Sequence, residues 1–245
     1  MKKQMKNHGD LLAAAQQGNR EAIRRYCSWL QKHEPGHVDI FVNLGVLAAR
    51  DGDFAEAIRL YKEGLNKFPD SAALHANLAR SLAECRQWQT AYDHARQAAA
   101  LQPDNYSAWL NLSWACIILG KSREAEVAAQ NALTLQPTSV AAWNNLGSAL
   151  KEQGRVRESV AAYRKVLELD PTYENGHLNM LLTLQYDPNA HLEEIILVAR
   201  QYARQFESAL LSSWSSHPNE PSPWRRLRIG FVSPDLNDHS VLYLA

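Results

Sequence analysis

The sequence predicts an all-α solenoid of two-helix repeats, followed by the stump of an α/β domain. Proline recurs every 34 residues, and apolar residues between the prolines are spaced by three and four, which is typical of amphipathic helices. A fixed period of this length predicts modules that stack in a row. The prolines are Pro35, Pro69, Pro103, Pro137 and Pro171.

The composition excludes several classes of protein. The 245 residues contain 26 Lys and Arg and 26 Asp and Glu, so a formal net charge of zero gives no reason to expect nucleic acid. No apolar run approaches the roughly 18 residues that span a bilayer, and no apolar segment follows the basic start, so neither a membrane span nor a signal peptide is expected. Three cysteines without a CxxC pair predict no disulfide, no metal site and a reducing, cytoplasmic setting. The oligomeric state stays open.

The repeats are predicted in the following order. Residues 1–37 form a degenerate capping repeat, because terminal repeats are atypical. Four regular repeats follow, at 38–71, 72–105, 106–139 and 140–173. Glycine between the two helices of a repeat supplies a left-handed cap, and the proline after the second helix ends it. The glycines are Gly18, Gly52, Gly120 and Gly154, and Arg86 stands in their place in the second regular repeat.

Side chains at fixed positions add detail to this pattern. Small residues, at Ala57, Ala91, Ala125 and Ser159, mark where two helices approach closely. The fourth position is aromatic in Phe41, Trp109 and Trp143, from which His75 departs, and the seventh is Leu44, Leu78, Leu112 and Leu146. This pattern resembles the tetratricopeptide repeat, which implies a right-handed superhelix whose first helices line a concave groove.

An asparagine occupies the sixth position of five successive repeats. These residues are Asn43, Asn77, Asn111, Asn145 and Asn179. Asparagine is a mediocre helix former, so the column needs an explanation. Facing a groove, each amide offers one acceptor and two donors to the main chain of an extended peptide, about one for every third residue. The alternative is that these side chains bond to neighbouring helices and only shape the superhelix.

A second groove chemistry is less well supported by the residues. Some tetratricopeptide co-chaperones hold a C-terminal carboxylate with a clamp of Lys, Arg and Asn. The eight groove positions beside the asparagines include one cation, Arg80; the others are Val42, Val46, Ala76, Leu110, Trp114, Asn144 and Ser148. A carboxylate would therefore find little positive charge here.

The segment after Pro171 leaves the repeat pattern. Residues 174–214 are predicted to form a partial repeat and one longer amphipathic helix, over about 191–213, that packs on the last repeat. Residues 215–224, rich in proline and serine, are a predicted linker. Residues 225–245 are predicted to be the first strand and loop of an α/β domain whose remainder is missing or supplied by another chain.

These last residues carry a second resemblance. The run Arg226-Leu-Arg-Ile-Gly-Phe-Val-Ser-Pro-Asp-Leu236 with His239-Ser240 is similar to the start of the catalytic domain in the SPINDLY-like and O-GlcNAc transferase family. The resemblance implies a solenoid that recruits protein acceptors for sugar transfer from UDP-N-acetylglucosamine to Ser or Thr. It places His239 at the catalytic site; without the resemblance, His239 would be a loop residue at a helix start.

The donor-binding part of that family has no counterpart in the chain. No glycine-rich phosphate loop, no HExxH and no GxSxG motif occurs, so the chain alone is expected to bind no cofactor and to transfer no sugar. The other interpretation is a stand-alone scaffold that binds a protein or an extended peptide in its groove.

Overall fold

The computed structural model describes residues 19–208, and every secondary-structure element in that range is helical. By its contacts the chain divides into residues 1–208 and 209–245. The predicted linker and the predicted strand at 225–245, with His239, lie outside the described residues, as do residues 1–18 of the capping repeat. The helices are α2 (Arg20–His33), α3 (Val38–Arg50), α4 (Phe54–Lys67), α5 (Ala72–Glu84), α6 (Trp88–Leu101), α7 (Tyr106–Ile118), α8 (Ser122–Leu135), α9 (Val140–Glu152), α10 (Val156–Leu169), α11 (Glu174–Leu184) and α12 (Leu192–Tyr202).

The helix pairs follow the predicted 34-residue grid. In each regular repeat the first helix (the A helix) has 13 residues and the second (the B helix) has 14. The turn between them contains a residue in the left-handed region: Gly52, Gly120 and Gly154 have φ of 79°, 70° and 73°. Arg86 adopts the same conformation with φ of 59°, at the steric cost that a Cβ brings there.

Glycine has a second use inside the A helices, where it faces a tyrosine of the B helix. A Cβ on Gly45 would lie 2.3 Å from Cε1 of Tyr61, and a Cβ on Gly147 would lie 2.7 Å from Cε1 of Tyr163. Both tyrosines are fully buried. The middle repeats instead carry a small residue in each helix, Ala79 with Ala95 in the second. The two helices of a repeat therefore stay close because a large side chain on one helix faces a glycine on the other, or small side chains face each other.

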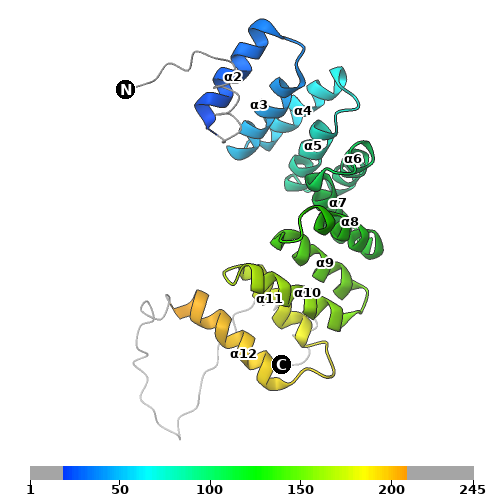
Figure 1. Cartoon of the computed structure of the whole chain (residues 1–245), viewed down its shortest axis with the longest axis vertical. Helices are drawn as coiled ribbons and strands as arrows, with labels where there is room; N and C mark the ends of the chain where they lie inside the picture. Colours follow the sequence, from blue (N-terminus) through cyan, green and yellow to red (C-terminus); the bar gives the residue numbers. More distant parts are fainter. Residues whose placement is uncertain (1–18, 209–245) are drawn as a thin grey trace, which may run out of the picture. The chain divides into compact units, whose positions relative to one another are not determined.

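The pairs stack in chain order, so that each repeat buries an apolar stripe that it cannot bury alone (Figure 1). The A helices of neighbouring repeats contact one another, α3 with α5, α5 with α7, α7 with α9 and α9 with α11. The B helices of neighbouring repeats make no comparable contacts in the described part of the chain. The A helices consequently form the inner side of the stack, as the resemblance implies.

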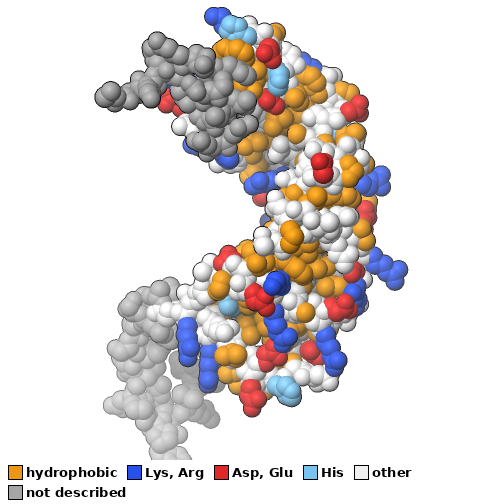
Figure 2. Space-filling model, viewed as in Figure 1, with side chains coloured by type: hydrophobic (Ala, Val, Ile, Leu, Met, Phe, Trp, Pro, Cys, Tyr) orange, Lys and Arg blue, Asp and Glu red, His pale blue; other side chains and the backbone are white. Residues whose placement is uncertain are grey.

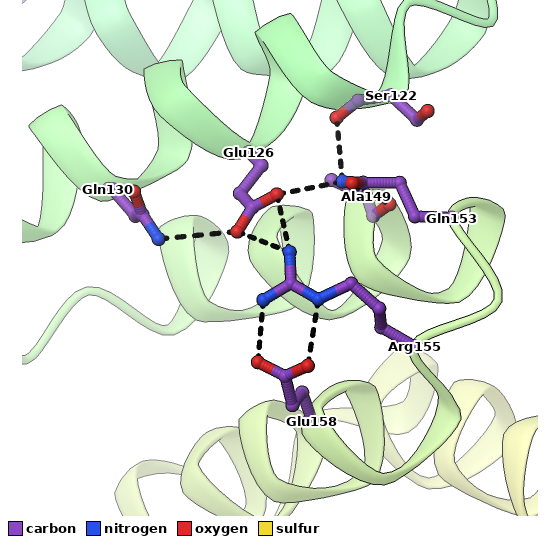
Figure 3. Close-up of polar contacts among 7 residues, drawn as sticks. All are labelled: Ser122, Glu126, Gln130, Ala149, Gln153, Arg155 and Glu158. Carbon is purple, nitrogen blue, oxygen red and sulfur yellow. Dashed lines mark hydrogen bonds and ion pairs between the residues drawn. The ribbon is translucent and has the colours of Figure 1, made fainter.

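Polar contacts on the other side join one repeat to the next (Figure 3). Arg155, the residue before α10, donates to both carboxylate oxygens of Glu126 on α8, at 2.7 and 2.8 Å, and to Glu158 on α10 at 2.7 and 2.6 Å. The Nε2 of Gln153 also donates to Glu126, at 2.8 Å. Hydrogen bonds from Gln153 and Arg155 hold the pKa of Glu126 below its ordinary value against the opposing effect of burial.

Two further helices follow the regular repeats, where a partial repeat and a longer helix were predicted for residues 174–214. α12 begins at Leu192, and its Val198 packs in a cluster with Val160, Tyr163, Met180 and other residues of the last repeats. A π-helical turn, Ala203–Glu207, follows α12. The helix predicted over about 191–213 is thus α-helical to Tyr202 and π-helical from Ala203 to Glu207, and residues 209–213 lie outside the described residues.

Candidate peptide-binding groove

A groove of about 470 Å³ lies on the inner side of the stack, and three of the five predicted asparagines line it. Asn77 comes from α5, Asn111 from α7 and Asn145 from α9. Five of the eight neighbouring positions singled out in the sequence also line it: Arg80, Leu110, Trp114, Asn144 and Ser148. Positions five and nine of an A helix are about one turn apart, and position six lies next to position five and three residues before position nine, so helical periodicity brings these side chains to one side of the helix. Asn43 and Asn179 do not line this groove.

Each asparagine of the column donates one hydrogen bond within the protein. Asn43 and Asn77 bond to the carbonyl oxygens four residues earlier, of Asp39 and Ala73, each at 2.9 Å. Three others bond to the preceding A helix: Asn111 to the Ala76 carbonyl at 2.9 Å, Asn145 to Ser113 Oγ at 2.8 Å and Asn179 to Asn144 Oδ1 at 3.0 Å. The alternative interpretation, a bond to a neighbouring helix, therefore describes one N–H of Asn111, Asn145 and Asn179, whereas Asn43 and Asn77 bond within their own helices.

Each amide keeps hydrogen-bonding groups that the described part of the protein does not use. The side-chain oxygens of Asn77, Asn111 and Asn145 accept no hydrogen bond from the residues that the structure describes. An amide oxygen has two lone pairs, and each amide keeps a second N–H. The bond that holds an amide in place therefore leaves an acceptor and a donor for a ligand's main chain.

The groove is nearly uncharged. Among the described residues that line it, Arg80 is the single charged side chain, and it is exposed and makes no ion pair with another described residue. Figure 2 shows Lys and Arg side chains interspersed with Asp and Glu over the viewed face, in keeping with the formal net charge of zero. The expectation of one cation beside the asparagines is confirmed, so this groove lacks the charge of a carboxylate clamp.

Ser148, which lines the groove, is held in place by a buried side chain of the B helix. Its hydroxyl shares a hydrogen bond of 2.9 Å with the hydroxyl of Tyr163, which is completely buried between α9 and α10. Burial raises the pKa of Tyr163 to about 12, so its hydroxyl remains protonated and keeps this contact throughout the physiological range.

A hydrogen bond at the fourth position of the A helix was missed by the sequence analysis. The indole Nε1 of Trp109 and Trp143 donates to the carbonyl of Pro103 and Pro137, at 2.7 and 2.9 Å. His75 and His177 make the same contact through Nε2, to Pro69 at 2.9 Å and Pro171 at 2.8 Å. His75, which departs from the aromatic pattern, thus preserves the interaction. In the sequence, this bond could have been predicted from a side chain with an N–H group six residues after the proline that closes each repeat.

This contact fixes the tautomer of each histidine. A carbonyl only accepts, so Nε2 carries the proton and the Nδ1 of a neutral ring is an acceptor. The Nδ1 of His75 lies 2.8 Å from Nδ1 of His94, which then donates. Burial, with the nearby His75, lowers the pKa of His94. The corresponding Nδ1 of His177 is buried and has no partner among the described residues.

Other site classes are not represented in the described range. Residues 19–208 contain no cluster of three His, Cys, Asp or Glu residues arranged to hold a metal ion. Among the same residues, no helix has the length and apolar character that crossing a membrane requires. Cys27 and Cys116 are buried and Cys85 is exposed, all as free thiols.

Comparisons with known proteins agree with this geometry. Tetratricopeptide-repeat models match residues 7–72, 106–139 and 140–173. A crystal structure of MamA protein has a TM-score of 0.61 at 19% identity, over 74% of this chain and 98% of that one. YrrB, described as a tetratricopeptide-repeat protein with an unusual peptide-binding site, has a TM-score of 0.62 at 16% identity, over 76% and 95% of the two chains.

One curated relative is matched over a short stretch. The peroxisomal targeting signal receptor of Candida albicans is 34% identical over 87 residues, which are 36% of this chain and 15% of the receptor. The repeat models, the helix pairs on their 34-residue grid and the solved structures agree on one architecture. The described part of the chain is a tetratricopeptide-repeat solenoid.

Proposed function

We propose that this chain is a scaffold that holds an extended polypeptide segment in the groove of α5, α7 and α9. The observation that supports it most directly is the set of three amides, Asn77, Asn111 and Asn145, that line one groove and whose oxygens accept no hydrogen bond from residues 19–208. A peptide main chain presents the matching N–H and C=O groups whatever its side chains are. YrrB, with its peptide-binding site, gives the same fold a precedent for this use.

The experiment measures peptide affinity in variants of one asparagine at a time. Asn77→Ala is the most informative change, because Asn77 bonds only to its own helix among the described residues. Its removal therefore breaks no hydrogen bond between the described repeats. Loss of one amide contact should weaken a groove-bound peptide by roughly threefold to tenfold. The matched control is Asn66→Ala, which removes an exposed asparagine from the B helix α4. Equal affinities for the wild type and Asn77→Ala would contradict the proposal.

A second candidate function rests on the sequence of residues 226–240. Under it, the groove recruits acceptor proteins for a protein O-glycosyltransferase of the SPINDLY and O-GlcNAc transferase type, and His239 lies at the catalytic site. Calorimetric titration with UDP tests the accompanying expectation that this chain lacks the donor site. No saturable binding is expected; saturable binding at micromolar concentrations would overturn it.

A further inference from the structure

The inner faces of successive A helices differ in polarity. Positions five, nine and thirteen are one turn apart and form a single row along each helix. The row is apolar on α7, polar on α9 and apolar again on α11. Its members are Leu110, Trp114 and Ile118 on α7, Asn144, Ser148 and Glu152 on α9, and Leu178, Leu182 and Tyr186 on and just after α11.

The row on α11 is exposed to solvent along its length, whereas on α7 Leu110 and Trp114 are half-buried and only Ile118 is exposed. Ile118 is 47% exposed on α7, whereas Leu178, Leu182 and Tyr186 are 43%, 45% and 65% exposed at α11. The core-facing side of α11 is a different one, on which Met180 and Leu184 are buried against Val198. Leu178 and Leu182 therefore contribute little to the core. Large apolar side chains gathered on one face in this way mark an interaction surface.

The charge at the other end of the groove is equally specific. Arg80 occupies position nine of α5, one repeat before the α7 row, and is the one charged residue among the described groove-lining side chains; Glu84, at position thirteen of the same row, is exposed and does not line this groove. A partner that brought a basic residue to this point would meet an unpaired guanidinium, whereas an acidic residue would be attracted. Along the stack the order is then a cation at α5, an apolar row at α7, a polar row at α9 and an apolar row at α11.

The spacing of the helices converts this order into a peptide pattern. Neighbouring packed helices lie about 8–10 Å apart, and an extended chain advances about 3.3 Å per residue. One repeat therefore corresponds to roughly three residues of an extended peptide and two repeats to roughly five or six. We propose that the partner is an extended segment with an acidic residue about three positions from one apolar anchor and a second apolar anchor five or six positions beyond, in either chain direction. This deepens the proposed function and rests on it.

The test is a selection from a phage library of random 16-residue peptides on the full chain, followed by affinity measurements with the selected peptides as synthetic probes. The selected sequences should share the acidic and two apolar positions at these spacings. Arg80→Glu should weaken them roughly fivefold to tenfold and should favour probes in which the acidic residue is lysine. Leu178→Ser with Leu182→Ser should weaken them about tenfold and remove the preference for the second anchor. Val127→Ser, which removes an exposed apolar side chain from the B helix α8, should change nothing.

Three contradicting outcomes are distinguishable. Selected peptides that Asn77→Ala weakens, but that lack the spacing or are insensitive to Arg80 and to the leucine pair, would overturn this inference and leave the proposed function standing. Selected peptides with apolar residues at helical spacing would overturn the extended conformation. A selection that enriches no peptide sensitive to Asn77→Ala would overturn the proposed function and this inference together.

Discussion

Replacing Asn145 by alanine should destabilise the solenoid, whereas the same change at Asn77 should not. Asn145 is 9% exposed and donates to the hydroxyl of Ser113, which is completely buried, across the interface between two repeats. Deleting the donor leaves a buried acceptor unsatisfied, at about 1–2 kcal/mol. The higher helix propensity of alanine offsets about 0.6 kcal/mol of that cost, so a net loss of about 1 kcal/mol is expected.

At Asn77 the same replacement is not expected to lower the free energy of unfolding. Its hydrogen bond is exposed and runs to Ala73 in its own helix, so solvent replaces it at little cost. The gain in helix propensity remains, and the variant should equal the wild type or exceed it by up to about 0.5 kcal/mol.

Urea denaturation followed by far-ultraviolet circular dichroism measures this difference. Repeat arrays need not unfold in one step, so midpoints and slopes should be compared between the two variants and not extrapolated for one. The cycle of Asn145→Ala with Ser113→Ala should show a coupling of about 1 kcal/mol. Equal midpoint shifts for Asn77→Ala and Asn145→Ala, or the absence of coupling, would refute the division of the column into bridging and free amides.

Three further predictions concern the scaffold. Gly45→Ala should cost about 1–3 kcal/mol of unfolding free energy, because its Cβ meets the Tyr61 ring, but should become neutral or stabilising in a Tyr61→Ala background; a cost of the same size in both backgrounds would contradict this. Arg86→Gly should raise thermal stability by about 1 kcal/mol, since φ is 59° there; a lower melting temperature would count against it. The lowered pKa of His94 means that its neutral form is the native one, so stability is fully present above about pH 6.5 and is lost as the pH falls below that value. His94→Gln, which can still donate to His75, should lose less stability between pH 7.5 and 5.5 than the wild type in urea titrations; an equal loss would contradict it.

The repeat architecture could be predicted from the sequence because its signals are periodic. Glycine or its substitute at one position must adopt positive φ, and the structure places Gly52, Gly120, Gly154 and Arg86 there. The shared face of the asparagines follows from helical periodicity in the same way, and Asn77, Asn111 and Asn145 line one groove. Signals that repeat at a fixed spacing reinforce one another, so each position is supported by the others.

Interactions that depend on three-dimensional neighbours could not be predicted. The N–H of each asparagine that bonds within the protein can reach its own helix or the preceding one, and only the packing shows that Asn77 bonds to the first and Asn145 to the second. By residue type His75 is an exception to the aromatic pattern, although its Nε2–H donates to the proline carbonyl as the tryptophan indoles do. The end of α12 at Tyr202 also has no marker, because its amphipathic pattern continues into the π-helical turn.

The central claim is that the amide oxygens of the groove accept hydrogen bonds from a peptide main chain. An N-methyl scan of one groove-binding peptide tests it most directly, because each N-methyl group removes one main-chain donor and leaves the side chains unchanged. Affinity should fall at positions about three residues apart, and the fall at one of them should disappear in Asn77→Ala. Uniform tolerance of N-methylation, in a peptide whose side-chain substitutions still abolish binding, would contradict the claim.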